Sequence, residues 1–456
     1  MKKLLLLTAT MLCCLCIQAK PKAKAPQPHL MGTIYPSERT TYNDPVTGLQ
    51  IQVLTDTVGN DQYIYQTDPM WTPDQRFLLF RSSKRAGDVP AEGRWPQTQF
   101  FVMEVATGRI LQLTDGEHGS VFMANRSNDL FINRREEVLD RKHKPTGEQR
   151  WTLSRLSIDQ LWEDALQGKV ADHTQYETLL GSMNANDSIW GIPGSYCVSS
   201  EDAYAYIVLS RKSDDPAELA EMQRYAMKPR DNQPIKIKPA LGGIARMNLR
   251  TGEVDKVLDT FFKVGHIQAS RFHDDEILFC NETGGDARQR IWYVRGDGTG
   301  FRPIYEETAL DWVTHETFGT EDYVYFNILG FQDRLRRQAS GIMRINLRTD
   351  DVECIGQVEL QGSPYNDHPA LGGRGFWHCN STRDNRLATG DTFAGNVWVI
   401  DVQTGLRTLI VTDCRMTPDH AQPHFSPDGR YLLFQSGHFT DGKRLNLMMV
   451  DLQQLK

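Results

Sequence analysis

The chain has 456 residues, of which 39% are hydrophobic and 24% are charged, a composition typical of a soluble globular protein that buries a large core. Its formal net charge is -7, and no long basic run occurs beyond the N-terminal leader, which argues against a nucleic-acid partner. No later segment is a long, uninterrupted apolar run, so we expect no membrane span.

The N-terminus has the pattern of an export signal. Two lysines precede a mostly apolar run from 4 to 17, and Ala19 is a plausible cleavage residue before a basic stretch. We therefore predict a signal peptide over residues 1–19 and a periplasmic or secreted protein. The alternative is a lipoprotein anchored through Cys13, Cys14 or Cys16. It is less favoured because none of these cysteines follows the small residues that a lipid-attachment signal normally has.

Repeats follow the leader. Segments 71–82 and 425–436 are near copies, each with a strand end, a Pro-Asp turn and an apolar strand. A second unit joins two strands through a Thr-Gly-type turn and recurs at 101–108, 245–252, 343–350 and 397–405. Together the two units give four short strands in roughly 40 to 50 residues, the period of a β-propeller blade.

We therefore predict an all-β fold, a seven-bladed β-propeller over residues 48–456 that follows an N-terminal extension over 20–47. The blades are expected at roughly 66–116, 117–190, 191–262, 263–308, 309–358, 359–414 and 415–454. The last blade ends after three strands, and the strand at 48–55 is predicted to complete it and to close the ring. Residues 159–181 and 214–238 interrupt the strand repeat and are predicted to contain short helices.

One position of the repeat carries the candidate site residues. A histidine precedes the first strand in three successive units, as His266, His315 and His368. Gln422 has this place in the last unit, and Asp68 has it in the first. In a propeller the same position of every blade faces one axial channel, so residues far apart in the sequence meet there. We expect a shared metal or catalytic centre.

Imidazole nitrogens combined with amide or carboxylate oxygens suit borderline divalent ions such as zinc or manganese. We predict a metal centre made of His315, Gln422 and His424, with His368 or Asp419 as a further ligand. Gln422 and His424 are two residues apart on an extended segment, so their side chains leave on the same face, and His420 shares this parity as a reserve candidate. A polar, water-filled channel without an ion is the alternative.

Several short motifs resemble those of the oligogalacturonate lyases, most clearly between residues 264 and 329. The matching pieces include Val264-Gly265-His266, Arg290-Ile291-Trp292, Thr314-His315-Glu316 and Pro423-His424-Phe425. The resemblance implies a seven-bladed propeller that cleaves uronic-acid oligosaccharides by β-elimination. It also implies a manganese ion on the axis, which histidines and a glutamine hold and which binds the substrate carboxylate.

The resemblance assigns roles to individual residues. His315 matches the first metal histidine of the family, and His424 matches the last histidine of its final-blade motif. That motif reads Gln-x-x-His-Pro-His in the family, whereas this chain has Asp419 and Gln422 at its first two conserved positions. His266 matches a histidine beside the substrate, and Arg246 is a candidate counterpart of an arginine used near the site.

In β-elimination the enzyme neutralises the uronate carboxylate and then removes the proton at C5. A divalent ion does the first as a Lewis acid, and a base with a pKa near the working pH does the second. We predict His266 as this base or as a charge stabiliser, with an arginine or a tyrosine as alternative bases. The predicted function is an exported carbon–oxygen lyase that uses a divalent ion, with manganese favoured.

Two other functions stay open at this point. A non-catalytic propeller of the Tol type explains the Ser-Pro-Asp-Gly turn but not the recurring histidines. The accessory propeller of a serine peptidase is the weaker alternative, because we find no hydrolase domain beside the repeats. The nature of the uronic acid, whether galacturonate, glucuronate or a sulfated uronate, is not predicted.

Overall fold

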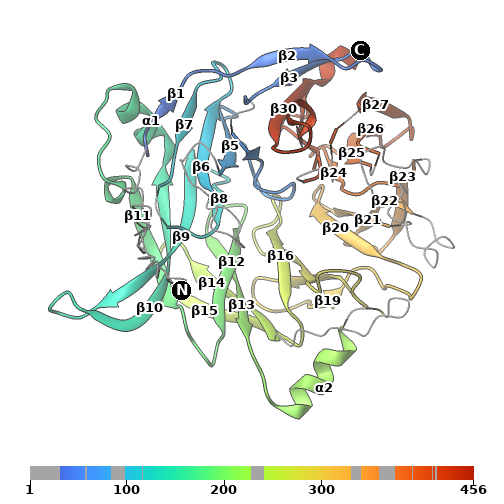
Figure 1. Ribbon diagram of the computed structural model, residues 1–456. Coiled ribbons are helices and arrows are strands. Elements are labelled where there is room, and N and C mark those ends of the chain that lie inside the picture. The colour runs from blue at the N-terminus through green and yellow to red at the C-terminus, as the bar shows by residue number, and fades with distance from the viewer. Residues whose placement is uncertain are drawn as a thin grey trace, which may run out of the picture.

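The computed structural model describes residues 31–56, 59–83, 98–115, 117–226, 228, 241–329, 340–358, 375–392, 394–412, 414–415 and 419–455. The predicted signal peptide lies outside these ranges. Within them the strands form seven antiparallel sheets, which are arranged around a central axis as the blades of a propeller (Figure 1). This confirms the predicted fold class.

Each of the first six blades is built on four strands that follow one another in the chain, with the inner strand first. Blades 1 to 3 consist of β4 (Asp61–Gln62), β5 (Phe77–Ser82), β6 (Gln99–Glu104), β7 (Ile110–Gln112); β8 (Val121–Met123), β9 (Asp129–Leu139), β10 (Pro145–Ser157), β11 (Glu177–Asn184); and β12 (Ile192–Val198), β13 (Tyr204–Arg211), β14 (Leu241–Asn248), β15 (Val254–Thr260). Blades 4 to 6 consist of β16 (Val264–Ala269), β17 (Glu276–Asn281), β18 (Ile291–Arg295), β19 (Arg302–Pro303); β20 (Val313–Phe318), β21 (Tyr323–Ile328), β22 (Gly341–Asn346), β23 (Val352–Gly356); and β24 (Asn380–Ser381), β25 (Leu387–Asp391), β26 (Val397–Asp401), β27 (Arg407–Val411).

The last blade combines the two ends of the chain. It contains β28 (His424–Phe425), β29 (Tyr431–Ser436), β30 (Asn446–Asp451), β3 (Gln50–Val53) and β2 (Thr40–Asn43). Gln52 pairs with Met449 and Val53 with Met448, so the N-terminal strand completes this blade as predicted. Figure 1 shows the blue β3 beside the red β30. A further strand, β1 (Ile34–Tyr35), pairs with the outer strand of blade 1.

The core lies between neighbouring blades. In one cluster Trp151 of blade 2, Tyr206 of blade 3 and Phe279 of blade 4 pack together, and each is at most 1% exposed. Both faces of a middle strand are therefore covered, which explains why β5 and β17 are almost continuous runs of buried residues. Because the core lies between the blades, the side chains at the axis are not needed for it and can line a functional site.

Two short helices lie within the predicted insertions. Helix α1 (Ile158–Leu166) is capped by Ser157 and buries Leu161 and Trp162, and helix α2 (Pro216–Arg224) is capped by Asp215. Both lie at the perimeter of the ring in Figure 1. With nine residues each, neither described helix is long and apolar enough to cross a membrane.

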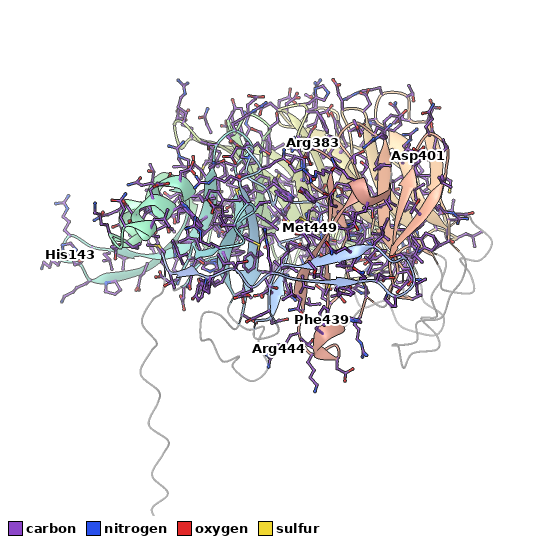
Figure 2. All side chains as sticks on the ribbon, turned by 90° about the horizontal axis from the view of Figure 1, so that it is seen from above. His143, Arg383, Asp401, Phe439, Arg444 and Met449 are labelled. Atoms are coloured by element: carbon purple, nitrogen blue, oxygen red, sulfur yellow. The ribbon has the colours of Figure 1, made fainter. Side chains whose placement is uncertain are left out.

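The inner strands are interrupted at the recurring position. His266 and His315 have φ values of 46° and 55°, and the pairing register shifts around them in β16 and β20. Gln422, just before β28, has a φ of 49°. Such left-handed residues are uncommon outside glycine, and bulges of this kind redirect a side chain away from the regular strand face. Figure 2 shows Arg383, which follows the inner strand β24 (Asn380–Ser381), on the side of the ring away from Phe439 and Arg444.

Candidate active site

The turn after each inner strand defines the recurring position in the structure. Ser426 Oγ donates to Asp428 Oδ1 at 2.6 Å, and Thr72 Oγ1 makes the same contact with Asp74 at 2.7 Å. In blade 6 the equivalent bond joins Thr382 and Asp384 at 2.6 Å. Four residues before these hydroxyl residues are Gln422, Asp68 and His378.

In blade 6, where the repeat predicted His368, the structure has His378 at this place. The turn Thr382-Arg383-Asp384-Asn385 replaces the Ser-Pro-Asp-Gly type, with Asn385 at a φ of 58° where the last blade has Gly429 at 68°. The position belongs to His378, ten residues further along the chain. His368 itself lies outside the described residues. The Thr-x-Asp pattern in the sequence is the signal that identifies His378.

Three histidines of blades 5, 6 and 7 form a cluster at the axis. The ring centroids of His315 and His378 are 4.1 Å apart, and those of His378 and His420 are 5.3 Å apart. Trp377 packs against His315 and against His420, with 5.2 Å between centroids in both pairs. Ring closure has thus brought together residues separated by more than one hundred positions.

Asp391, at the end of β25, orients this cluster. One carboxylate oxygen accepts hydrogen bonds from the backbone N–H of His378 at 2.9 Å and from its Nδ1 at 3.0 Å. The other accepts from the backbone N–H of Gln422 at 3.1 Å. Burial alone would raise the pKa of Asp391, but His378 and these hydrogen bonds lower it, so the carboxylate is ionised. Because Nδ1 of His378 is bonded to Asp391, its Nε2 can bind another partner.

The donor atoms of this region are of the kind that a divalent ion binds. Nδ1 of His315, Nδ1 of His420 and both ring nitrogens of His424 are buried and have no hydrogen-bond partner among the residues that the structure describes. Burial lowers the pKa of His420 to about 4 and that of His424 to about 3, and it holds the pKa of His315 well below its usual value. These rings are neutral at pH 7, which is the form that binds a metal ion.

The structure brings only part of the predicted ligand set together. His315 and Gln422 lie at the cluster, and the amide nitrogen of Gln422 donates to Asp419 Oδ2 at 3.2 Å, which leaves its oxygen as a donor to an ion. The ring of His424 packs edge-on against Tyr63, at 5.2 Å between centroids, and not against the other histidines. Sequence reasoning missed His378 and Asp391.

The opposite side of the axis, toward blades 1 to 4, holds a cavity of about 630 Å³. Its polar lining includes Asp68, Arg81, His118, Ser120, Ser195 and His266. Burial raises the pKa of Asp68 to about 6, against the opposing charges of Arg271, His266 and Arg81. The cavity therefore combines a titratable carboxyl, an imidazole and a guanidinium.

His266 is held in place by Glu282, which directly follows β17. His266 Nε2 lies 3.1 Å from Glu282 Oε2, while the other carboxylate oxygen accepts from the backbone N–H of Gly284 at 2.6 Å. Burial would raise the pKa of Glu282, but the bond to His266 and the charge of Arg290 lower it to about 2. An ionised acceptor keeps the proton on Nε2 of His266 and leaves Nδ1 as the basic atom.

A buried ion pair connects the two sides. Arg290 donates from Nε to Glu316 Oε2 at 2.8 Å, and both side chains are at most 6% exposed. Glu316 directly follows His315, and its carbonyl oxygen accepts from the side chain of Gln268 at 2.8 Å. The ion pair therefore joins the start of β18 in blade 4 to the inner strand of blade 5, and the Gln268 bond joins the two inner strands directly.

Arg246 is not at this site. It lies on β14, the third strand of blade 3, where its guanidinium donates to Asp255 at 3.4 Å and stacks on Tyr204 at 5.0 Å from the ring centroid. It lines neither the cavity nor the histidine cluster. The prediction of a catalytic role for Arg246 is corrected accordingly, because third strands lie away from the axis.

Comparisons with known proteins agree with this architecture. No family model matches the chain. The oligogalacturonide lyase of Pectobacterium atrosepticum is 22% identical over 425 residues, which cover 90% of this chain and 96% of that protein. The oligogalacturonate lyase of Dickeya dadantii is 21% identical over 416 residues, covering 88% of this chain and 93% of that protein.

Solved structures show the same fold. An oligogalacturonate lyase in complex with manganese superposes with a TM-score of 0.66 at 18% identity, over 92% of this chain and 98% of that one. The oligogalacturonate lyase of Vibrio parahaemolyticus gives a TM-score of 0.64 at 16% identity, with the same coverage. The chain is thus similar in sequence to the oligogalacturonate lyases over about nine-tenths of its length and shares their seven-bladed fold.

Proposed function

We propose that this protein is an exported lyase that cleaves short uronic-acid oligosaccharides, oligogalacturonate first among them, by metal-assisted β-elimination. The observation that carries the proposal is the placement of His266. An ionised Glu282 holds this imidazole at the wall of a cavity that also contains Arg81, and the cluster of His315, His378 and His420 lies on the other side of the axis. The names of the relatives support the substrate.

The ligands of the proposed ion are His315, His378 and His420, together with the side-chain oxygen of Gln422. When bound, the ion supplies a Lewis acid that neutralises the uronate carboxylate. Asp391 keeps His378 in a ligating orientation, because it occupies Nδ1 and so directs Nε2 to the ion. Manganese is favoured because a structurally similar lyase was solved with it.

The proton transfer falls to His266. Its Nδ1 takes the proton from C5 of the uronate ring, the electrons of the C5–H bond form the C4–C5 double bond, and the C4–O4 bond breaks. The ionised Glu282 stabilises the imidazolium that results. The leaving oxygen takes up a proton, for which Asp68 on the same cavity wall is our candidate donor.

The direct test is the rise in ultraviolet absorbance from unsaturated uronate when the purified protein is incubated with oligogalacturonate, with manganese or with a chelator. We expect activity that the chelator removes and that His315→Ala abolishes. His273→Ala is the matched control, because His273 pairs with Glu321 away from the cluster. Galacturonate, glucuronate and sulfated uronate oligomers should be compared, since each presents a carboxylate.

A protein that binds no metal and cleaves no uronate oligomer would instead favour the non-catalytic Tol-type propeller, which the observed Ser426–Gly429 turn also fits. Export is tested separately by sequencing the N-terminus of the mature protein. Cleavage after Ala19 would yield Lys20 as the first residue, whereas a lipid-modified cysteine would indicate the lipoprotein alternative.

A further inference from the structure

Arg81 is a largely buried cation that forms no ion pair with any residue that the structure describes. It lies near the end of β5 and lines the cavity of about 630 Å³ together with His266. Its Nε atom is buried and has no hydrogen-bond partner, and within the part of the chain that the structure describes no carboxylate forms an ion pair with it. Burial lowers the pKa of Arg81, and the more distant charges of Asp419 and Asp68 act in the opposite direction.

Two other buried cations, Arg290 and Lys228, are paired with carboxylates, whereas Arg271 donates to the carbonyl oxygen of Thr67 at 3.1 Å. Arg290 contacts Glu316 at 2.8 Å, and Lys228 contacts Glu307 at 2.8 Å and Asp286 at 3.3 Å. A buried charge is costly unless it is paired and hydrogen-bonded, and a guanidinium cannot release its proton to avoid this cost. An anion that enters the cavity would supply the missing partner.

We infer that Arg81 binds a second carboxylate of the substrate, so that the cavity beside His266 is a subsite for the uronate residue next to the one that is cleaved. This inference rests on the proposed function. An oligouronate carries one carboxylate on every ring, so a chain with one carboxylate at the histidine cluster presents another to its surroundings. The planar guanidinium matches a carboxylate in a two-point hydrogen bond. The hydroxyl groups of Ser120 and Ser195, which line the same cavity, offer hydrogen bonds to the sugar hydroxyls.

The test combines a variant of the protein with a variant of the substrate. Saturated trigalacturonate, and the same trimer with the neighbouring carboxyl methyl-esterified, are titrated calorimetrically into wild-type protein and into Arg81→Gln. For wild type, esterification should weaken binding about tenfold to a hundredfold, the range expected for a lost charge-assisted hydrogen bond. The affinity of Arg81→Gln for the free acid should be lower than that of the wild type by the same factor. Esterification should not weaken binding to this variant any further, because the two changes remove the same interaction.

The inference would be overturned if Arg81→Gln lowered the affinity for both ligands equally, or for neither. Arg81→Lys should restore part of the affinity for the free acid only. Arg295→Gln serves as the matched control, because Arg295 pairs with Asp275 at an exposed turn. A Tm of Arg81→Gln that is unchanged or higher shows that the variant is folded, because the change removes an unpaired buried charge. Binding without cleavage by the wild type would count against the proposed lyase and would leave the comparison of the two ligands valid.

Discussion

Replacing Glu282 by glutamine tests the chemistry of the site with a minimal change of shape. In the wild type, Oε1 of Glu282 accepts from the N–H of Gly284 and Oε2 faces Nε2 of His266. The glutamine oxygen is expected to stay on Gly284, because that N–H needs an acceptor. Its NH2 group then faces His266 and can only donate. The imidazole must accept at Nε2 and carry its proton on Nδ1, so the basic atom of the proposed mechanism is lost.

The expected loss is large. A positioned general base contributes about 10² to 10⁴ in rate, so kcat of Glu282→Gln should fall by roughly that factor while KM changes little. Steady-state release of unsaturated uronate at saturating oligogalacturonate measures the effect. Glu282→Asp should recover part of the rate, because it restores an acceptor.

Combining Glu282→Gln with His266→Ala provides the control. If Glu282 acts through His266, the second change should cost almost nothing once the first is present. A Glu282→Gln variant with wild-type kcat would refute the reasoning. So would an equal loss of rate in the presence and absence of the His266 imidazole.

Three further predictions concern metal binding, closure of the ring and pH. Asp391→Asn should weaken manganese binding about tenfold to a hundredfold, because Asp391 orients the ligand His378. Asp297→Asn, at an exposed position, is the control and should leave manganese binding unchanged. The manganese retained after dialysis is measured by mass spectrometry for both variants. Ile51→Ala, in the closing strand, should cost about 2 to 5 kcal/mol in urea unfolding, because Ile51 is fully buried, and Val46→Ala, at a 69% exposed position, should cost far less. The metal-free protein should lose stability as the pH falls from about 6.5 toward 4. In this range the unfolded chain protonates His420 at its ordinary pKa, whereas the folded chain does not, because burial lowers the pKa of His420 to about 4. Thermal melts that show constant stability over this pH range would contradict the prediction.

The acidic side of the stability curve has a separate contribution from Glu282. Because interactions in the folded protein lower its pKa to about 2, its stabilising contribution is complete above the ordinary glutamate range and is lost as the pH falls through about 2. Glu282→Gln should lack this contribution.

Much of the architecture follows from local patterns in the sequence. The near copies at 71–82 and 425–436 and the Thr-Gly-type turns predict blade spacing, because a Pro-Asp or Thr-Gly turn between apolar strands is specified by a few neighbouring residues. The closing strand was predictable for the same reason, since an unfinished last blade requires a partner. At the recurring position that the repeat predicts, His266, His315 and Gln422 have φ values of 46°, 55° and 49°, so all three have a left-handed backbone conformation.

Local patterns in the sequence do not predict which side chains of the site contact each other. Glu282 contacts His266 from the neighbouring strand, and Asp391 connects His378 of its own blade to Gln422 of the next. Among the described residues Arg81 has no ion-pair partner. These relations depend on how closing the ring brings together blades that are distant in sequence, and no spacing within one repeat encodes them. The repeat therefore determined which residues face the channel, and only the packed ring decided which of them meet.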